Sequence, residues 1–219
     1  MKTIIENISI ENFQFSILQY EEPLSFLDLL LAKGDDHPDV LDERIPYWLE
    51  LWPSAIGLGR HLFSLGTIIS GQTTLELGCG IGIPSMVVEK LEGRPILSDY
   101  TQEALDFSKS NWQLNVNQLP PFIELDWRNP PSDLKVDFIL ASDIAYERRY
   151  FSVLPITFKK LIKPGGKIFL SEPGRIIAVE FMDLLEKEGF EIAVFSYEGT
   201  LKGKQYCVQV YELYPPDIN

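Results

Sequence analysis

Three glycines at alternate positions, Gly78, Gly80 and Gly82, follow a β-branched and apolar run at residues 74–77. The run is typical of a buried strand, and the residues after the glycines are typical of a helix. Glycine lets the backbone turn with a positive φ and lets a ligand lie against the main chain, while the start of a helix offers free N–H groups. The stretch therefore predicts a strand, a tight turn and a helix that bind a nucleotide-like cofactor.

Acidic residues accompany this strand and end the next two predicted strands. Asp99 ends the run 95–99, about twenty residues after the first glycine, the spacing at which a carboxylate meets the ribose hydroxyls of a bound nucleoside. Asp126 and Trp127 end the run 122–127 and can offer an acceptor and a stacking face to an adenine ring. Asp99 can instead cap the helix predicted over 101–116. We expect these residues in the cofactor site: Glu76, Gly78, Gly80, Asp99, Asp126 and Trp127.

A fourth predicted strand, residues 136–142, is followed by Asp143-Ile144-Ala145-Tyr146. In an open parallel sheet, ligands bind at the carboxyl ends of the strands, near the switch in strand order. We therefore expect Asp143 and Tyr146 to face the reacting end of the ligand, with Ser142 on the cofactor side. The alternative for Asp143 is a structural one, because an aspartate can cap the next helix.

The spacing of the glycines distinguishes between cofactors. A dinucleotide fingerprint, G-x-G-x-x-G, needs a glycine where this chain has Ile83, which argues against an NAD-dependent oxidoreductase. The pattern here, with Glu76 in front, is E-x-G-x-G-x-G. It resembles motif I of the class I, seven-stranded S-adenosylmethionine-dependent methyltransferases, and this resemblance implies S-adenosylmethionine as the cofactor.

Further motifs resemble one branch of that class. Residues 46–53 read P-Y-W-L-E-L-W-P, which is similar to the entry helix of small protein-lysine methyltransferases of family 16, related to the electron-transfer-flavoprotein β-subunit lysine methyltransferase. Leu-Asp-Trp at 125–127 and D-x-x-Y at 143–146 match the same branch. The resemblance implies that Trp52 lies near the methionine end of the cofactor, whereas we expect Trp48 to be a core anchor. Residues 171–175 resemble its D-P-G-R, but Glu172 replaces the aspartate, so no role is carried over to it.

The chemistry implied is methyl transfer to a lysine amine of a protein acceptor. A lysine is charged at pH 7, and only the neutral amine has a lone pair with which to attack. Asp143 and Tyr146 are therefore expected to orient the amine in a site that excludes water. A small-molecule N-methyltransferase similar to nicotinamide N-methyltransferase is the alternative. A non-catalytic S-adenosylmethionine-binding module is a further one, disfavoured because the acids and D-x-x-Y are intact.

The composition and the order of elements predict an α/β fold. The chain has 219 residues, of which 45% are hydrophobic and 12% aromatic, as expected for one domain with a full core. We expect a Rossmann-like seven-stranded methyltransferase sheet in the order 3-2-1-4-5-7-6, with its last strand antiparallel and helices on both faces. Residues 46–219 would form this domain. Residues 1–45 would form an N-terminal extension, a β-hairpin that helps to wall the substrate entrance and an acidic loop.

Patterns along the chain predict the individual elements. The stop signals are Gly93, the run Lys163 to Gly166, and Gly189. The expected helices are 24–32, 53–65, 83–91, 101–116, 149–162 and 176–188. After the four strands already described, a fifth is expected at 167–170, and a final antiparallel pair at 190–196 and 205–213.

Charge and residue usage limit the partners. A net charge of −13 opposes binding to a polyphosphate backbone, so no nucleic-acid partner is expected. Two cysteines and two histidines predict neither a disulfide framework nor a metal site, and the early apolar run 29–32 is too short to span a bilayer. A cytoplasmic protein without membrane attachment is expected, and its oligomeric state stays open.

Acidic residues outnumber basic ones in the first quarter of the chain. Five of them lie in one segment predicted to be a loop: Asp35, Asp36, Asp39, Asp42 and Glu43. An acidic rim of this kind can steer a basic substrate by long-range attraction. The alternative is a solvated face that keeps the protein in solution.

Overall fold

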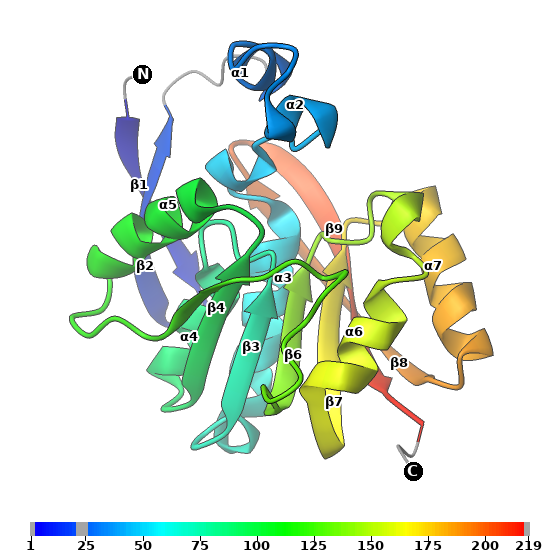
Figure 1. Cartoon of the computed structure of the whole chain (residues 1–219). Coiled ribbons are helices and arrows are strands. Elements are labelled where there is room, and N and C mark those ends of the chain that lie inside the picture. Colours follow the sequence, from blue (N-terminus) through cyan, green and yellow to red (C-terminus); the bar gives the residue numbers. More distant parts are fainter. Residues whose placement is uncertain (1–2, 21–25, 217–219) are drawn as a thin grey trace.

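A seven-stranded sheet lies between two layers of helices (Figure 1). The structure is a computed structural model that describes residues 3–20 and 26–216. The strand order is β5-β4-β3-β6-β7-β9-β8, in which β9 is antiparallel to both of its neighbours and the other pairs are parallel. Because β3 is the first strand of this sheet, the order is the predicted 3-2-1-4-5-7-6. The strands are β3 (Thr73–Leu77), β4 (Arg94–Asp99), β5 (Phe122–Glu124), β6 (Val136–Ser142), β7 (Ile162–Glu172), β8 (Glu191–Leu201) and β9 (Lys204–Tyr214).

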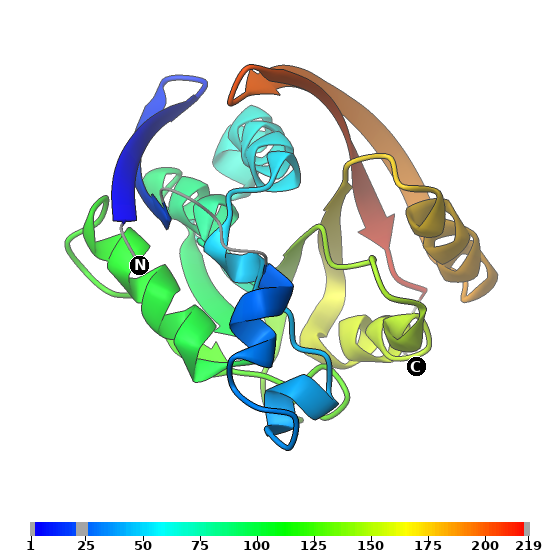
Figure 2. The ribbon, with the colours of Figure 1, turned by 90° about the horizontal axis from the view of Figure 1, so that it is seen from above.

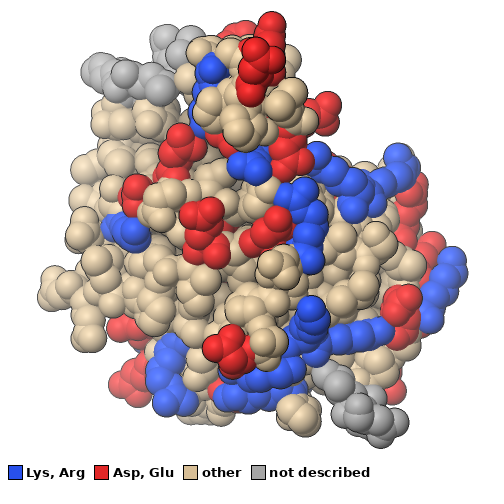
Figure 3. Space-filling view, in the orientation of Figure 1, with Lys and Arg blue, Asp and Glu red and all other residues tan. Residues whose placement is uncertain are grey.

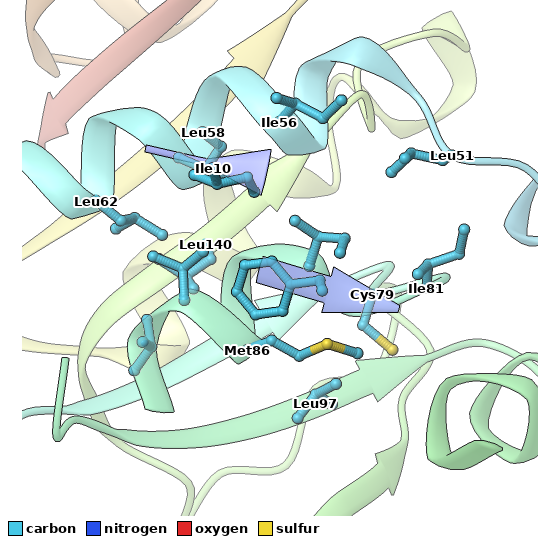
Figure 4. Packing of buried hydrophobic residues seen from close by; sticks show 14 of the residues in the cluster. Ile10, Leu51, Ile56, Leu58, Leu62, Cys79, Ile81, Met86, Leu97 and Leu140 are labelled. Atoms are coloured by element: carbon cyan, nitrogen blue, oxygen red, sulfur yellow. The ribbon is translucent and has the colours of Figure 1, made fainter. Parts of the chain in front are cut away.

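Helices cover both faces of the sheet, and each face has its own apolar core. Alternation along the central strands divides the residues, so that Phe138 and Leu140 of β6 face one core while Ile139 and Ala141 face the other. Figure 4 shows part of the first core. Its helices are α3 (Pro53–Leu65), α4 (Ile83–Lys90) and α5 (Gln102–Gln113), and the second core is covered by α6 (Leu154–Leu161) and α7 (Ile176–Lys187).

The N-terminal segment forms the predicted hairpin, β1 (Thr3–Ile10) and β2 (Phe13–Tyr20). Its inward side chains belong to the first core, where Ile10 packs so closely on α3 that a Cβ at Gly59 would lie 2.9 Å from it. On the other side, Asn111 of α5 and Asn115, just after that helix, each bond the backbone N–H and C=O of one β2 residue, Leu18 and Ser16 respectively. The hairpin is thus bound to the body of the molecule on two sides.

The expectation that this hairpin walls the substrate entrance was wrong. None of the described hairpin residues lines the cavity at the carboxyl ends of the strands. Seen from above, the hairpin lies beside α3, and the tip of the β8–β9 hairpin lies on the other side of that helix (Figure 2). Residues between 43 and 52, which precede α3, and Ala55 of α3 itself line the cavity instead.

Several boundaries differ from the predicted ones. β5 ends at Glu124, so Asp126 and Trp127 lie beyond the strand, in a turn that the Asn129 amide closes on the Asp126 carbonyl. β7 already begins at Ile162, because this residue pairs with Val136 before the register shifts. The predicted stop signal at 163–166 therefore lies inside a strand. β8 and β9 are longer than predicted, and α6 begins later than expected, after a 3₁₀ turn at Arg148–Tyr150.

The acidic segment is not a simple loop. It contains α2 (Pro38–Leu41), which His37 caps by accepting the Asp39 amide, and it follows α1 (Phe26–Leu31). The first two residues of the helix predicted over 24–32 lie outside the described residues. Among the described residues, no helix is both long enough and apolar enough to cross a bilayer. The division of the chain at residue 46 stays a prediction.

Candidate active site

A cavity of about 380 Å³ lies at the carboxyl ends of β3, β4 and β6. The chain enters β4 on one side of β3 and β6 on the other, so the loops that follow these strands diverge and leave space between them. The volume lies in the range of small-molecule sites. Nine of the ten predicted site residues line this cavity: Trp52, Gly78, Gly80, Asp99, Asp126, Trp127, Ser142, Asp143 and Tyr146.

The glycine turn forms one wall with its backbone. Gly78 has φ 62° and Gly80 has φ 48°, both in the left-handed region that favours glycine. A Cβ at Gly78 would lie 3.3 Å from the side chains of Ile144 and Trp127, and one at Gly80 would lie 3.5 Å from the Trp48 backbone. A ligand in the cavity can therefore approach the main chain of the turn directly, which is the fit that a nucleoside cofactor requires.

Asp99 is held against this turn. Its Oδ2 accepts the Gly80 amide at 3.0 Å, and its Oδ1 accepts the Tyr100 amide at 2.8 Å. Burial raises the pKa of Asp99, although these amides oppose the shift. The cap of α5 is Thr101, whose hydroxyl accepts the Ala104 amide at 3.2 Å. The alternative role of Asp99 as the cap of that helix is therefore ruled out, and its carboxylate faces the cavity.

Glu76 is the predicted site residue that the structure places elsewhere. It is fully buried beneath the glycine turn, and its Oε2 accepts the Ser85 amide at the start of α4, at 3.0 Å. It does not line the cavity, so the expectation of a direct cofactor contact is corrected. The spacing of a motif gives a position along the strand, but the side chain here points under the turn and ties it to the helix. Burial raises the pKa of Glu76 to about 8.

Replacement of Glu76 by Gln is expected to change how stability depends on pH. Unfolded Glu76 ionises near its ordinary pKa, whereas the folded protein holds the proton up to about pH 8, so the native state binds more protons between these values. Stability of the wild type therefore falls as pH rises through this window. Urea titrations should show that the wild type loses about 2–5 kcal/mol of unfolding free energy relative to Glu76→Gln between pH 5 and 8.

The matched control for this measurement is Glu186→Gln, because Glu186 is an exposed glutamate of α7. Groups that titrate elsewhere contribute equally to wild type and variant, so the difference between them isolates one carboxyl group. A difference that stays constant between pH 5 and 8 would show that Glu76 is not protonated in the folded protein.

Aromatic rings form the remaining walls. Trp127 contacts Tyr150 edge to face, with ring centroids 5.1 Å apart, and its carbonyl accepts the Thr157 hydroxyl at 2.6 Å. Asp126, beside it, is paired with Arg128 through Nε at 2.9 Å. An aromatic face and a partly neutralised acceptor thus lie in the turn after β5, at the place where the sequence predicts the adenine contacts.

Trp52 and its neighbours Tyr47 and Trp48 form a further wall of the cavity. The indole Nε1 of Trp52 donates to the Tyr47 carbonyl at 2.9 Å. The Tyr47 ring packs edge to face on both Trp52 and Tyr146, at centroid distances of 6.0 and 5.5 Å. Trp48 packs on Phe107 in the first core and also lines the cavity, so it is a core anchor, as predicted, and a wall residue as well.

Asp143 and Tyr146 line the cavity in the loop that follows β6. Asp143 has φ 58°, and its buried carboxylate is bound by the guanidinium of Arg175, with Nη2 at 3.2 Å from Oδ2. Burial raises the pKa of Tyr146, so its hydroxyl keeps its proton at neutral pH. The 3₁₀ turn that follows is preceded by Glu147 at its N-cap position, so Asp143 does not cap it.

A cluster of paired charged side chains lies at the rim of the cavity, near Asp99. Arg44 lies over the Tyr100 ring, with its Cζ 4.0 Å from the ring centroid, and Asp39 binds Lys33 and Arg44 at 2.6 and 2.8 Å. Asp42 contacts Arg44 at 3.2 Å and faces further arginines at the rim. Figure 3 shows acidic and basic side chains interspersed on this face. Asp39 and Asp42 are therefore neutralised locally, which weakens the hypothesis of an acidic rim.

Comparison with known proteins identifies the family. A sequence model of a family described as lysine methyltransferase matches residues 48–188. The chain belongs to the lysine methyltransferase family. The matched range contains the glycine turn, Asp99, Asp143, Tyr146 and Arg175, and begins within the P-Y-W segment. Membership makes this region a methyltransferase domain, and its cofactor is S-adenosylmethionine, as the glycine pattern predicts.

The names of similar proteins give different methylation substrates. The chain is 27% identical over 141 residues to histone-arginine methyltransferase METTL23 of Mus musculus, covering 59% of this chain and 56% of that protein. It is 33% identical over 161 residues to ribosomal protein L11 methyltransferase of Vibrio campbellii, covering 62% and 52%. The chain thus spans little more than half the length of these relatives.

The same fold occurs in solved methyltransferases. Magnesium protoporphyrin IX methyltransferase (ChlM) from Synechocystis PCC 6803, solved with bound SAM, matches with a TM-score of 0.56 at 14% identity. The match covers 89% of this chain and 99% of that chain. At this identity the likeness concerns the fold alone.

Sequence reasoning missed two residues of this lysine methyltransferase family member. Arg175 lines the cavity and binds Asp143, while Glu172 is fully buried and accepts the Ala145 amide at 3.0 Å through Oε1. Both belong to the run 171–175, whose likeness to D-P-G-R was the available signal. The exchange of Asp for Glu obscured it, because the length of the side chain decides which amide it reaches.

Proposed function

We propose that this domain transfers a methyl group from S-adenosylmethionine to a lysine side chain of a protein. The observation that carries the proposal is one cavity with two chemically different ends. The glycine turn follows β3 and Asp99 ends β4, while Asp143 and Tyr146 follow β6, on the other side of β3. The first end suits a nucleoside, and the second suits a group with N–H donors.

The cofactor end is proposed to work through backbone and side chains together. Gly78 and Gly80 leave the main chain open, and the Asp99 carboxylate can accept from both ribose hydroxyls while Trp127 offers its face to the adenine. Trp52 and Ser142 line the stretch between this end and Asp143, where the methionine part would lie. Asp126 is paired with Arg128, and the lone pairs that this pairing leaves free would accept a hydrogen bond from the adenine amino group.

The acceptor end is proposed to hold and orient an amine. When bound, S-adenosylmethionine supplies a methyl group on a positively charged sulfur, so that a C–N bond forms from the amine lone pair as the C–S bond breaks and its electrons stay on sulfur. The Asp143 carboxylate can accept one N–H of the amine, and the Tyr146 ring forms the wall of its channel. The surplus proton of a charged lysine leaves to solvent before transfer.

A protein acceptor is supported by the names of the relatives, which include a histone and a ribosomal protein as substrates. Lysine as the acceptor side chain is supported by the description of the family and by the D-x-x-Y motif. A carboxylate beside a phenol and a wall of aromatic rings can surround the aliphatic stem of a lysine and bind its head.

The test is to incubate the purified protein with radiolabelled S-adenosylmethionine and a lysate of its own host. We expect one labelled protein band and, after hydrolysis of that band, label in methylated lysine. Asp143→Asn protein, added at the same concentration, is the control for methylation by enzymes of the lysate. Label confined to small molecules would favour the small-molecule N-methyltransferase, and label in methylated arginine or histidine would contradict lysine as the acceptor.

A further inference from the structure

One guanidinium lies between two carboxyl groups beneath the acceptor end of the cavity. Arg175 donates both of its terminal nitrogens to Asp143, with Nη2 at 3.2 Å from Oδ2. Its Nη1 is also 3.8 Å from Oε2 of Glu172. Glu172 is fully buried, and among the described residues its Oε2 has no hydrogen-bond partner. Arg175 is therefore the cation that two carboxyl groups share.

The ion pair of Asp143 and Arg175 has little net charge at neutral pH. Burial lowers the pKa of Arg175, but an arginine begins so high that its guanidinium stays charged. Burial raises the pKa of Glu172 to about 7, against the amides of Ile144 and Ala145, so this carboxyl is partly protonated there. Tyr47 interacts electrostatically with Arg175, and Tyr211 with Glu172. Four further ionisable groups line the same cavity: Tyr146, Glu147, Arg149 and Tyr150.

The charge at this position decides the protonation state of an amine that binds beside it. An isolated carboxylate stabilises an ammonium ion and raises its pKa, which works against methyl transfer because the ammonium has no lone pair. A guanidinium paired with the carboxylate cancels this effect. A carboxylate has about four lone-pair sites, and the fork of Arg175 takes two of them, so Asp143 can still accept an N–H.

We propose that Arg175, acting through Asp143, makes the acceptor end of the cavity select the uncharged form of an incoming amine over its ammonium ion. This inference rests on the proposed function, because it assumes that the acceptor is an amine. The charge beside Asp143, in contrast, can be measured without any acceptor. Arg175 is then a positioning residue: it holds the Asp143 carboxylate in place and lowers the pKa of the amine that binds beside it.

The first test is the pH dependence of kcat, which reports ionisations in the enzyme–substrate complex. Arg175→Gln removes the positive charge and keeps hydrogen-bonding capacity, and Arg175→Lys keeps the charge and loses the fork. We expect the acidic limb of the kcat profile to move up by roughly one to two pH units in Arg175→Gln and to stay in place in Arg175→Lys. Arg148→Gln, which removes an exposed arginine paired with Glu180 on α7, should not move it.

The second test needs no acceptor. Sinefungin carries an amine in place of the methyl-bearing sulfonium of S-adenosylmethionine, and S-adenosylhomocysteine carries neither. Titration calorimetry at pH 7 should show that Arg175→Gln increases the affinity for sinefungin relative to S-adenosylhomocysteine by about tenfold, while Arg175→Lys leaves this ratio unchanged.

The two measurements separate the two proposals. If Arg175→Gln and Arg175→Lys lower kcat alike and move neither the pH limb nor the affinity ratio, Arg175 only holds the shape of the loop and the inference is overturned. If the wild type methylates no amine, the proposed function fails, and the affinity ratio still supports or overturns the charge assigned to Arg175.

Discussion

Asp143→Asn is expected to lower the single-turnover rate of methyl transfer by roughly a hundredfold or more while cofactor affinity stays within a few-fold. The backbone at Asp143 has φ 58°, a conformation that asparagine tolerates well, so the substitution preserves the loop. It removes the charge that Arg175 binds and the second carboxylate oxygen, so the acceptor loses its positioning contact. The substitution also leaves the Arg175 charge uncompensated, which opposes the approach of any cation.

Cofactor affinity, melting temperature and single-turnover transfer should be measured on the same preparation. Tyr146→Phe is the companion variant and should lower the rate more mildly, because the ring that packs on Tyr47 remains and only the hydroxyl is lost. A lowered melting temperature with normal transfer would show that Asp143 has a structural role and would remove it from the chemistry.

Asp99→Ala is expected to weaken S-adenosylmethionine binding by about 1.5–3 kcal/mol, which corresponds to roughly tenfold to a hundredfold in affinity. The substitution removes a charged acceptor from the cavity and leaves the Gly80 and Tyr100 amides without their partner. Both effects act at the cofactor end, so the dissociation constant should change far more than the rate at saturating cofactor.

Titration calorimetry measures this effect directly, and Asp106→Ala is the matched control. Asp106 is an exposed carboxylate of α5, on the helix that follows Asp99, and its loss should leave affinity unchanged. Equal affinities of wild type and Asp99→Ala would remove Asp99 from the site.

The sequence predicted the elements best where one physical signal dominated. β6 and α3 have the predicted bounds, because a continuous apolar run and a proline at the first turn leave little choice. β7 was misjudged because Lys163-Pro164-Gly165-Gly166 has the composition of a stop signal. The pairing of Ile162 with Val136, a contact distant in sequence, extends the strand across it.

In the site, too, features set by local sequence were predicted, and contacts between residues distant in sequence were not. The motifs placed Asp99 and Asp143 at strand ends, and the parallel sheet brought these ends together. Glu76 was misplaced because spacing says nothing about which side of a turn a side chain takes. The partner of Asp143 could not be predicted, because Arg175 follows a different strand and only the folded sheet brings the two together.

The two asparagines that bind β2, Asn111 and Asn115, have a consequence for the behaviour of the protein at high concentration. A hairpin outside the main sheet has an open edge, and unpaired N–H and C=O groups along such an edge are a template on which another chain can add a strand. The amides of Asn111 and Asn115 occupy these groups at Leu18 and Ser16 in the way a neighbouring strand would. Two side chains far from the chemistry thereby keep these positions of the β2 edge from accepting a strand of another chain.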